Sequence, residues 1–75
     1  MPYIVVKAYP KDEAIKKAVA EDILRSFTEK WGCAAEAVTV KFEEYAPEDW
    51  QRQVKEQEID PHADEMTILS GKMQG

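Results

Sequence analysis

Two stretches of the chain have the residue pattern of β-strands. Residues 2–9 are rich in β-branched and aromatic types, and Pro10, which has no amide hydrogen to donate to a ladder, ends the stretch. Residues 37–45 alternate between apolar and polar types, which is the pattern of a strand with two unlike faces. One face carries Val38, Val40 and Phe42, and the other carries Thr39, Lys41, Glu43 and Tyr45.

A long amphipathic helix is predicted between these strands, over residues 12–31. Its apolar stripe follows a spacing of three to four residues, as a helix face requires. The stripe consists of Ile15, Val19, Ile23 and Phe27, with Ala18, Ala20, Leu24 and Trp31 beside them. Asp12 is a good N-cap, and Gly32 suits the left-handed position just past the last turn.

The part of the chain after the second strand carries weaker signals. Pro47 suits the first turn of a helix, and a short helix is predicted over residues 47–58, ended by Asp60-Pro61. Residues 60–75 are expected to form a flexible or subunit-contacting tail. Within it, residues 66–69 are candidates for a short strand or an arm, and residues 70–75 are expected to fray.

Strand, long helix and strand in this order predict a β-α-β unit with parallel strands, in an α/β (α+β) fold that forms a single domain over residues 1–75. A sheet of two strands leaves both of its edges open and one face bare. A homodimer would close this gap by forming a four-stranded sheet with two long helices. Self-association as a homodimer is therefore predicted.

Composition excludes several classes of function. The net charge of −5 argues against nucleic acid as the main partner, because phosphate binding needs a basic face. No apolar run is long enough to span a membrane, and no signal peptide is recognisable. The chain has one Cys and one His, so no structural metal site is expected and no cofactor is predicted. The free Cys33 and the missing leader indicate a cytoplasmic protein.

Candidate chemistry begins at Pro2. If Met1 is removed, the nitrogen of Pro2 becomes a secondary amine at the start of a strand. An α-amino group titrates near 7.7–8.0, and burial or a nearby cation lowers that pKa, so the neutral form is available as a general base. While Met1 remains attached, the same nitrogen is an amide and this chemistry is lost. The simpler interpretation is that Pro2 has no function, as in most proteins with proline at this position.

The sequence resembles the 4-oxalocrotonate tautomerase family of the tautomerase superfamily. The resemblance rests on the order and spacing of its motifs over most of residues 1–60, and it is nearest to the small dimeric bacterial branch. These motifs are Met1-Pro2-Tyr3-Ile4, Tyr9-Pro10-Lys11, Lys17-Ala18-Val19-Ala20-Glu21-Asp22-Ile23 and Pro47-Glu48-Asp49-Trp50.

The resemblance implies a role for each matching residue. Pro2 matches the catalytic proline that moves a proton between an enol and its 2-oxo acid. Lys11 falls where the family usually has an arginine that binds the substrate carboxylate, and Trp50 matches an aromatic residue that walls the pocket. Thr39 departs from the family, because the hexameric enzymes have a second arginine there. Lys41, on the same strand face, is the candidate replacement for this cation.

The resemblance therefore predicts a cofactor-independent keto–enol tautomerase that acts on a small carboxylate-bearing substrate. Two alternatives remain open. One is a hydratase or dehalogenase of small unsaturated acids on the same scaffold, with Glu43 or Glu44 activating water. The other is a non-enzymatic dimeric module for binding or assembly, in which the lysines are solvated charges and Trp50 is a packing residue.

Overall fold

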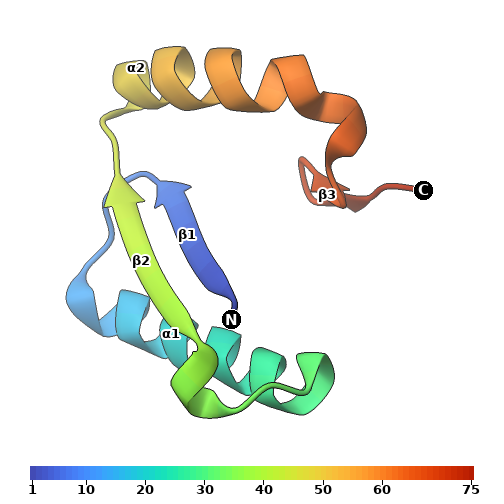
Figure 1. Ribbon diagram of the computed structural model, residues 1–75. Helices are drawn as coiled ribbons and strands as arrows, with labels where there is room; N and C mark the ends of the chain where they lie inside the picture. Colours follow the sequence, from blue (N-terminus) through green and yellow to red (C-terminus); the bar gives the residue numbers. More distant parts are fainter. The chain divides into compact units, whose positions relative to one another are not determined.

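The chain forms two compact units, and a computed structural model describes both of them over residues 1–75. The first unit, Met1–Tyr45, contains two strands and the long helix between them (Figure 1). The second unit, Ala46–Gly75, contains a helical run followed by a short hairpin. No helix of the protein is both long enough and apolar enough to cross a membrane.

A parallel pair of strands forms the sheet of the first unit. β1 (Tyr3–Ala8) and β2 (Thr39–Glu44) pair over their whole length, from Tyr3 opposite Thr39 to Ala8 opposite Glu44. Helix α1 (Glu13–Ser26) belongs to the crossover that joins them, and it runs along one face of the pair (Figure 1). Strands that run the same way need a crossover of this length. The predicted fold class, a β-α-β unit with parallel strands and a second helix, is confirmed.

The carboxyl end of the long helix is wound more loosely than the rest. After Ser26 the helix continues as the π-helical stretch η1 (Phe27–Trp31), so the two stretches together reach the residue at which the sequence pattern ends. The N–H groups of Gly32 and Cys33 both donate to the carbonyl of Phe27, at 3.0 and 3.2 Å. Gly32 has a φ of 85°, a left-handed conformation that glycine adopts without strain.

The inner face of this unit is apolar but incompletely covered. Val6 and Phe42 of the strands and Ile15 and Val19 of α1 line a hollow of about 210 Å³. Ile15 and Val19 nevertheless remain 45% and 42% exposed. The apolar stripe of α1 is thus wider than two strands can cover.

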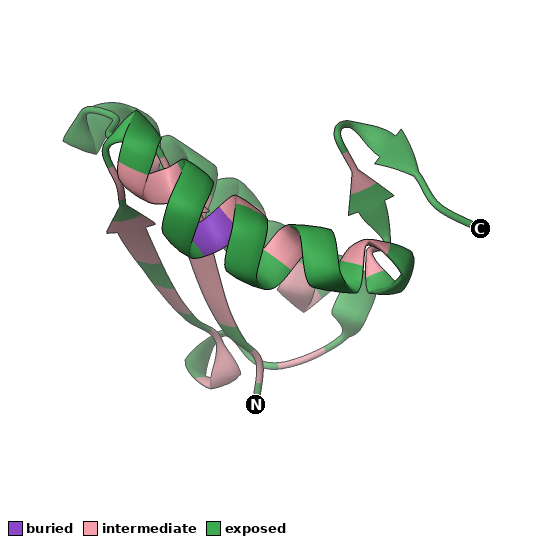
Figure 2. Ribbon diagram, turned by 90° about the horizontal axis from the view of Figure 1, so that it is seen from above, coloured by how far each residue is buried: buried purple, intermediate pink, exposed green.

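The second unit begins with a helical run that is longer than the sequence pattern predicts. It consists of α2 (Pro47–Asp49), the π-helical η3 (Trp50–Ile59) and the 3-10 stretch η4 (Asp60–Glu65). Pro61 falls in the first turn of η4, and the helical geometry is interrupted directly after it, because His62 has a φ of −121° and a ψ of 23°. Val54, with an exposed fraction of 4%, is the only buried residue of the protein (Figure 2).

The second unit ends in a hairpin that the sequence pattern does not predict. β3 (Ile68–Leu69) and β4 (Lys72–Met73) pair antiparallel, where residues 70–75 were expected to fray. The turn residues Ser70 and Gly71 have φ values of 50° and 81°. Two successive residues with positive φ match the twist of a tight hairpin, but serine is an uncommon first residue for such a turn.

The N-cap of α1 gives a direct test of this local structure. The side chain of Asp12 accepts a hydrogen bond of 2.9 Å from the N–H of Ile15. We expect Asp12→Ala to lower the free energy of unfolding by about 1 kcal/mol, because the N–H loses its partner. Asp12→Asn keeps an oxygen acceptor and is expected to retain most of the stability. Urea denaturation at one fixed protein concentration measures both, and equal losses in the two variants would contradict the capping role.

Candidate functional site

Pro2 lies at the amino end of the parallel sheet. Its carbonyl accepts a hydrogen bond of 3.2 Å from the N–H of Thr39, and the next residue, Tyr3, pairs directly with Thr39. Pro2 is half-buried, whereas Met1 beyond it is 99% exposed. Two of the sequence-predicted site residues, Pro2 and Thr39, are therefore neighbours in the structure.

Charged side chains gather on the sheet face opposite α1, which we call the polar face. Because side chains alternate along a strand, partnered positions of β1 and β2 share a face. The polar face consists of Tyr3, Val5, Lys7, Thr39, Lys41 and Glu43. The carboxylate of Glu43 is at the centre of its charges, 2.8 Å from the ammonium of Lys41 and 3.8 Å from that of Lys7. It also accepts a hydrogen bond of 3.2 Å from the hydroxyl of Tyr45.

These contacts change how the polar face ionises. The hydrogen bond from Lys41 is the main cause that lowers the pKa of Glu43 below the ordinary glutamate value, against the opposing effect of partial burial. The same bond raises the pKa of Lys41. Both groups are therefore charged at neutral pH, and the ammonium of Lys41 is already paired with a carboxylate.

Lys11 lies at the opposite end of β1 from Pro2. The strand between them has six residues, which at roughly 3.3 Å per residue span about 20 Å. A lysine side chain is much shorter than this distance. One chain therefore does not bring Pro2 and Lys11 together, although they are nine positions apart in the sequence.

Glu44 fastens the loop that carries Lys11. Its carboxylate accepts a hydrogen bond of 2.8 Å from the backbone N–H of Lys11 and lies 3.2 Å from the ammonium of Lys16. Lys16 also pairs with Glu13 at 2.8 Å. The bond from the Lys11 backbone, followed by that from Lys16, lowers the pKa of Glu44. The end of β2, the loop and the first turn of α1 are thus tied together by charge.

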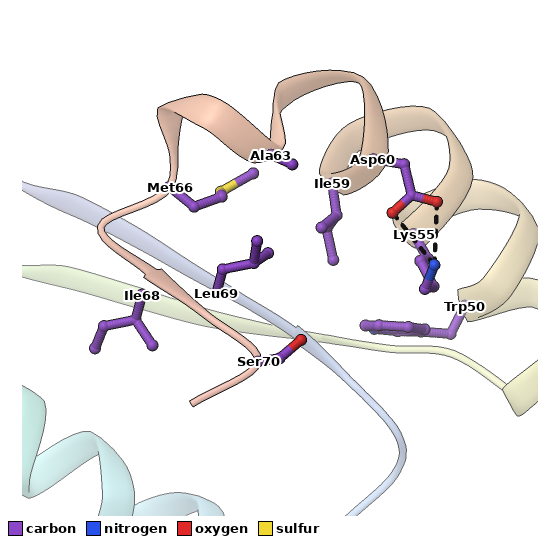
Figure 3. A pocket seen from close by; sticks show the side chains of 9 residues that line it. All are labelled: Trp50, Lys55, Ile59, Asp60, Ala63, Met66, Ile68, Leu69 and Ser70. Atoms are coloured by element: carbon purple, nitrogen blue, oxygen red, sulfur yellow. Dashed lines mark hydrogen bonds and ion pairs between the residues drawn. The ribbon is translucent and has the colours of Figure 1, made fainter. Parts of the chain in front are cut away.

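Trp50 belongs to the second unit, where it lines a cavity of about 460 Å³ (Figure 3). The indole forms one wall, and apolar side chains from the helical run and the hairpin form the others. These are Ile59, Ala63, Met66, Ile68 and Leu69. At its edge the ammonium of Lys55 lies 3.1 Å from the carboxylate of Asp60. The cavity suits an apolar group.

The other chemically reactive side chains are engaged locally. The thiol of Cys33 lies 3.4 Å from the carbonyl of Phe27, at the end of the long helix. The ring nitrogen Nδ1 of His62 lies 2.6 Å from Glu65 on the same helical stretch. No group of three or more His, Cys, Asp or Glu side chains is arranged to hold a metal ion.

Glu43 and Glu44 organise the charges of the sheet, a role that the sequence pattern does not predict. The pattern makes them candidates only as bases for a hydratase or dehalogenase. The structure instead joins Glu43 to Lys41 and Glu44 to Lys11. Alternation along one strand could have paired Lys41 with Glu43, because they are two residues apart. The contact of Glu44 with the distant loop required the strand register.

The fold and the site define a class of protein: a parallel β-α-β unit with a proline directly before its first strand. No protein-family model matches the chain. Curated relatives do: it is 37% identical over 73 residues to Tautomerase PptA of Pectobacterium atrosepticum, covering 95% of this chain and 96% of the relative. Proteins of the same name from Pectobacterium carotovorum and Enterobacter sp. (strain 638) are 34% and 32% identical over the same shares.

This level of identity over nearly the whole length shows the family. The chain belongs to the tautomerase family of 4-oxalocrotonate tautomerase-like proteins. The names of its relatives support a tautomerase-family, and hence isomerase, function.

The contacts of the Glu44 carboxylate with Lys11 and Lys16 predict a contribution to stability that depends on pH. The pKa of Glu44 in the folded chain is below the ordinary value of 4.5, so its carboxylate stabilises the fold above the unfolded-state pKa. That contribution is lost as the pH falls through the lowered value. We expect Glu44→Gln to unfold at lower urea concentration than the wild type at pH 7, with the difference shrinking toward pH 3. Glu36→Gln, at an exposed position of the short helical turn η2 (Ala35–Ala37), is the matched control. A Glu44→Gln deficit that is independent of pH would contradict the electrostatic role.

Proposed function

We propose that the protein is a cofactor-independent keto–enol tautomerase of small 2-oxo acids, with Pro2 as general base once Met1 is removed. The observation that carries the proposal is the likeness to proteins named tautomerase over 95% of the chain. The position of Pro2 at the head of β1, half-buried and next to Thr39, supports it. The free thiol of Cys33 suits a reducing cytoplasm.

In the proposed reaction the secondary amine of Pro2 moves one proton. It takes the proton from the enol hydroxyl and returns a proton to the carbon end of the double bond, which leaves the 2-oxo acid. A neutral amine with a pKa near working pH is suited to both steps. Thr39 is proposed to donate a hydrogen bond to the substrate oxygen. Trp50 is proposed to wall the pocket, where exclusion of water strengthens such polar contacts.

The length of β1 argues that a complete site needs two chains. Lys11, the proposed partner of the substrate carboxylate, lies about 20 Å from Pro2 of its own chain. β1 pairs with β2 along one edge only, so its other edge is open to a second copy. If two β1 strands pair antiparallel there, the end of one strand meets the start of the other. Lys11 of each chain then approaches Pro2 of its partner.

The same antiparallel pairing of two β1 strands would also bury exposed apolar side chains and enlarge the sheet. The half-exposed Ile15 and Val19 lie on the helix that covers the sheet, and a second helix beside it would bury them. A four-stranded sheet with two long helices results. We also propose that the units Met1–Tyr45 and Ala46–Gly75 act as one domain, because the relatives match across both.

The alternative functions have less support. A hydratase or dehalogenase would need Glu43 or Glu44 to activate water. Both carboxylates have a lowered pKa and are held by lysines or a backbone N–H, which makes them weaker bases. A binding module without activity would leave the tautomerase relatives without an explanation.

Pro2→Ala tests the general base. We expect it to lower the turnover of phenylenolpyruvate to its keto form by about a hundredfold or more, because the secondary amine is lost. Intact mass must first establish that Met1 is absent from both proteins. Lys17→Gln, on the exposed side of α1, is the control and should match the wild type. Equal rates for wild type and Pro2→Ala would refute the role of Pro2.

Subunit mixing tests whether the site is shared. Pro2→Ala and Lys11→Gln chains are each expected to turn over substrate poorly at low concentration. After the two are unfolded together and refolded at equal amounts, random pairing gives one unmutated site in half of the dimers. Activity should then rise to roughly a quarter of the wild-type value. Pro2→Ala mixed with the double variant Pro2→Ala/Lys11→Gln should show no recovery. Absence of recovery in the first mixture would place both residues in one chain or remove Lys11 from the site.

A further inference from the structure

The polar face carries two lysines, Lys7 and Lys41, and by the strand register Lys41 is the one nearer to Pro2. Thr39 bonds to Pro2, and Lys41 follows two residues later on the same face, opposite Val5. Along the strand its Cα is about 10 Å from the level of Pro2, and a lysine side chain that lies along the strand spans part of that distance. An unrestrained ammonium of Lys41 could therefore approach a substrate bound at Pro2.

The ion pair with Glu43 pulls this ammonium the other way. Glu43 lies two residues beyond Lys41, opposite Lys7, and hence farther from Pro2. The distance of 2.8 Å from the Lys41 ammonium to the Glu43 carboxylate is that of a charge-assisted hydrogen bond. The bond with Glu43, the strongest influence on the pKa of Lys41, draws the cation toward the carboxyl end of the strands, and a weaker interaction with Tyr3 acts from the amino end. Glu43 also adds a negative charge that would repel a second anionic group.

We propose that Glu43 is a specificity-determining residue, which withholds Lys41 from the substrate and so restricts the site to acids that carry one carboxylate. The proposal rests on the proposed tautomerase function and names the substrate class. One carboxylate is left to Lys11, and the remainder of the substrate is uncharged. Glu43 acts through Lys41 and is a positioning residue, not a catalytic one.

Binding of unreactive acids tests the proposal without relying on turnover. The probes are adipate, which has two carboxylates, and 3-phenylpropionate, which has one, titrated calorimetrically into protein that lacks Met1. We expect Glu43→Gln to bind adipate about three- to fivefold more tightly than the wild type, the upper part of the range that one exposed ion pair supports. Affinity for 3-phenylpropionate should change less than about twofold, because no second carboxylate is present to use the freed cation.

Two further variants separate this effect from a change in folding. Glu43→Asp keeps the charge and should keep the wild-type preference. In Glu43→Gln/Lys41→Gln the gain for adipate should vanish, because the cation that Glu43 withholds is gone. Urea denaturation of each variant ensures that only folded proteins are compared.

The binding and turnover results separate the role of Glu43 from the proposed reaction. No gain for adipate in Glu43→Gln, or a gain that survives removal of Lys41, would overturn the role of Glu43. Phenylenolpyruvate turnover is measured on the same samples. If no variant, nor the wild type, turns it over while the preference for adipate shifts as expected, the charge-based selection stands and the proposed reaction fails.

Discussion

The parallel strands β1 and β2 are held together by backbone hydrogen bonds. This ladder begins at the carbonyl of Pro2 and ends at the N–H of Tyr45, which donates to the carbonyl of Ala8 at 2.9 Å. This pairing places the proline at one end of a sheet six residues long and the Lys11 loop at the other. The relative positions of the candidate site residues Pro2, Thr39, Lys41 and Lys11 depend on this strand pairing. It brings Pro2 next to Thr39 and fixes Lys41 on the same face. It also places Lys11 about 20 Å from the proline of its own chain.

Two consecutive glutamates of β2 bind different lysines on the two faces of the sheet. Glu43 and Glu44 point to opposite faces because side chains alternate along β2. On the polar face, Glu43 gathers Lys41 and Lys7. On the other, Glu44 ties the Lys11 loop and Lys16 to the end of the strand. Glu43 thus controls whether Lys41 is available near Pro2. Its neighbour Glu44 fixes the position of the loop that carries Lys11.

Periodicity and capping signals were sufficient to predict the β-α-β unit and the extent of the long helix. Asp12 and Gly32 mark its ends because their conformations are local properties of the chain. Signals failed where a residue takes a role that its type seldom has. Ser70 adopts the left-handed conformation of a hairpin turn, which is uncommon for serine.

The spatial relations of the site were harder to foresee, because they depend on strand register. Pro2 and Lys11 are nine positions apart in the sequence, and the six-residue strand between them spans about 20 Å. The partner of Glu44 is a backbone N–H thirty-three positions away, which no local pattern encodes. The family resemblance supplied candidate residues, but not the charges that restrain them.

The order in which the strands leave the ribosome has a consequence for the amino terminus. β1 cannot pair until β2 exists, and the whole of the long helix is made between them. Helices form locally and quickly, whereas pairing of distant strands must wait for the intervening chain. Met1 and Pro2 therefore remain an unpaired, accessible end throughout the synthesis of the first forty residues or so. If Met1 is removed in that interval, the release of the Pro2 amine precedes the pairing of the strand that carries it.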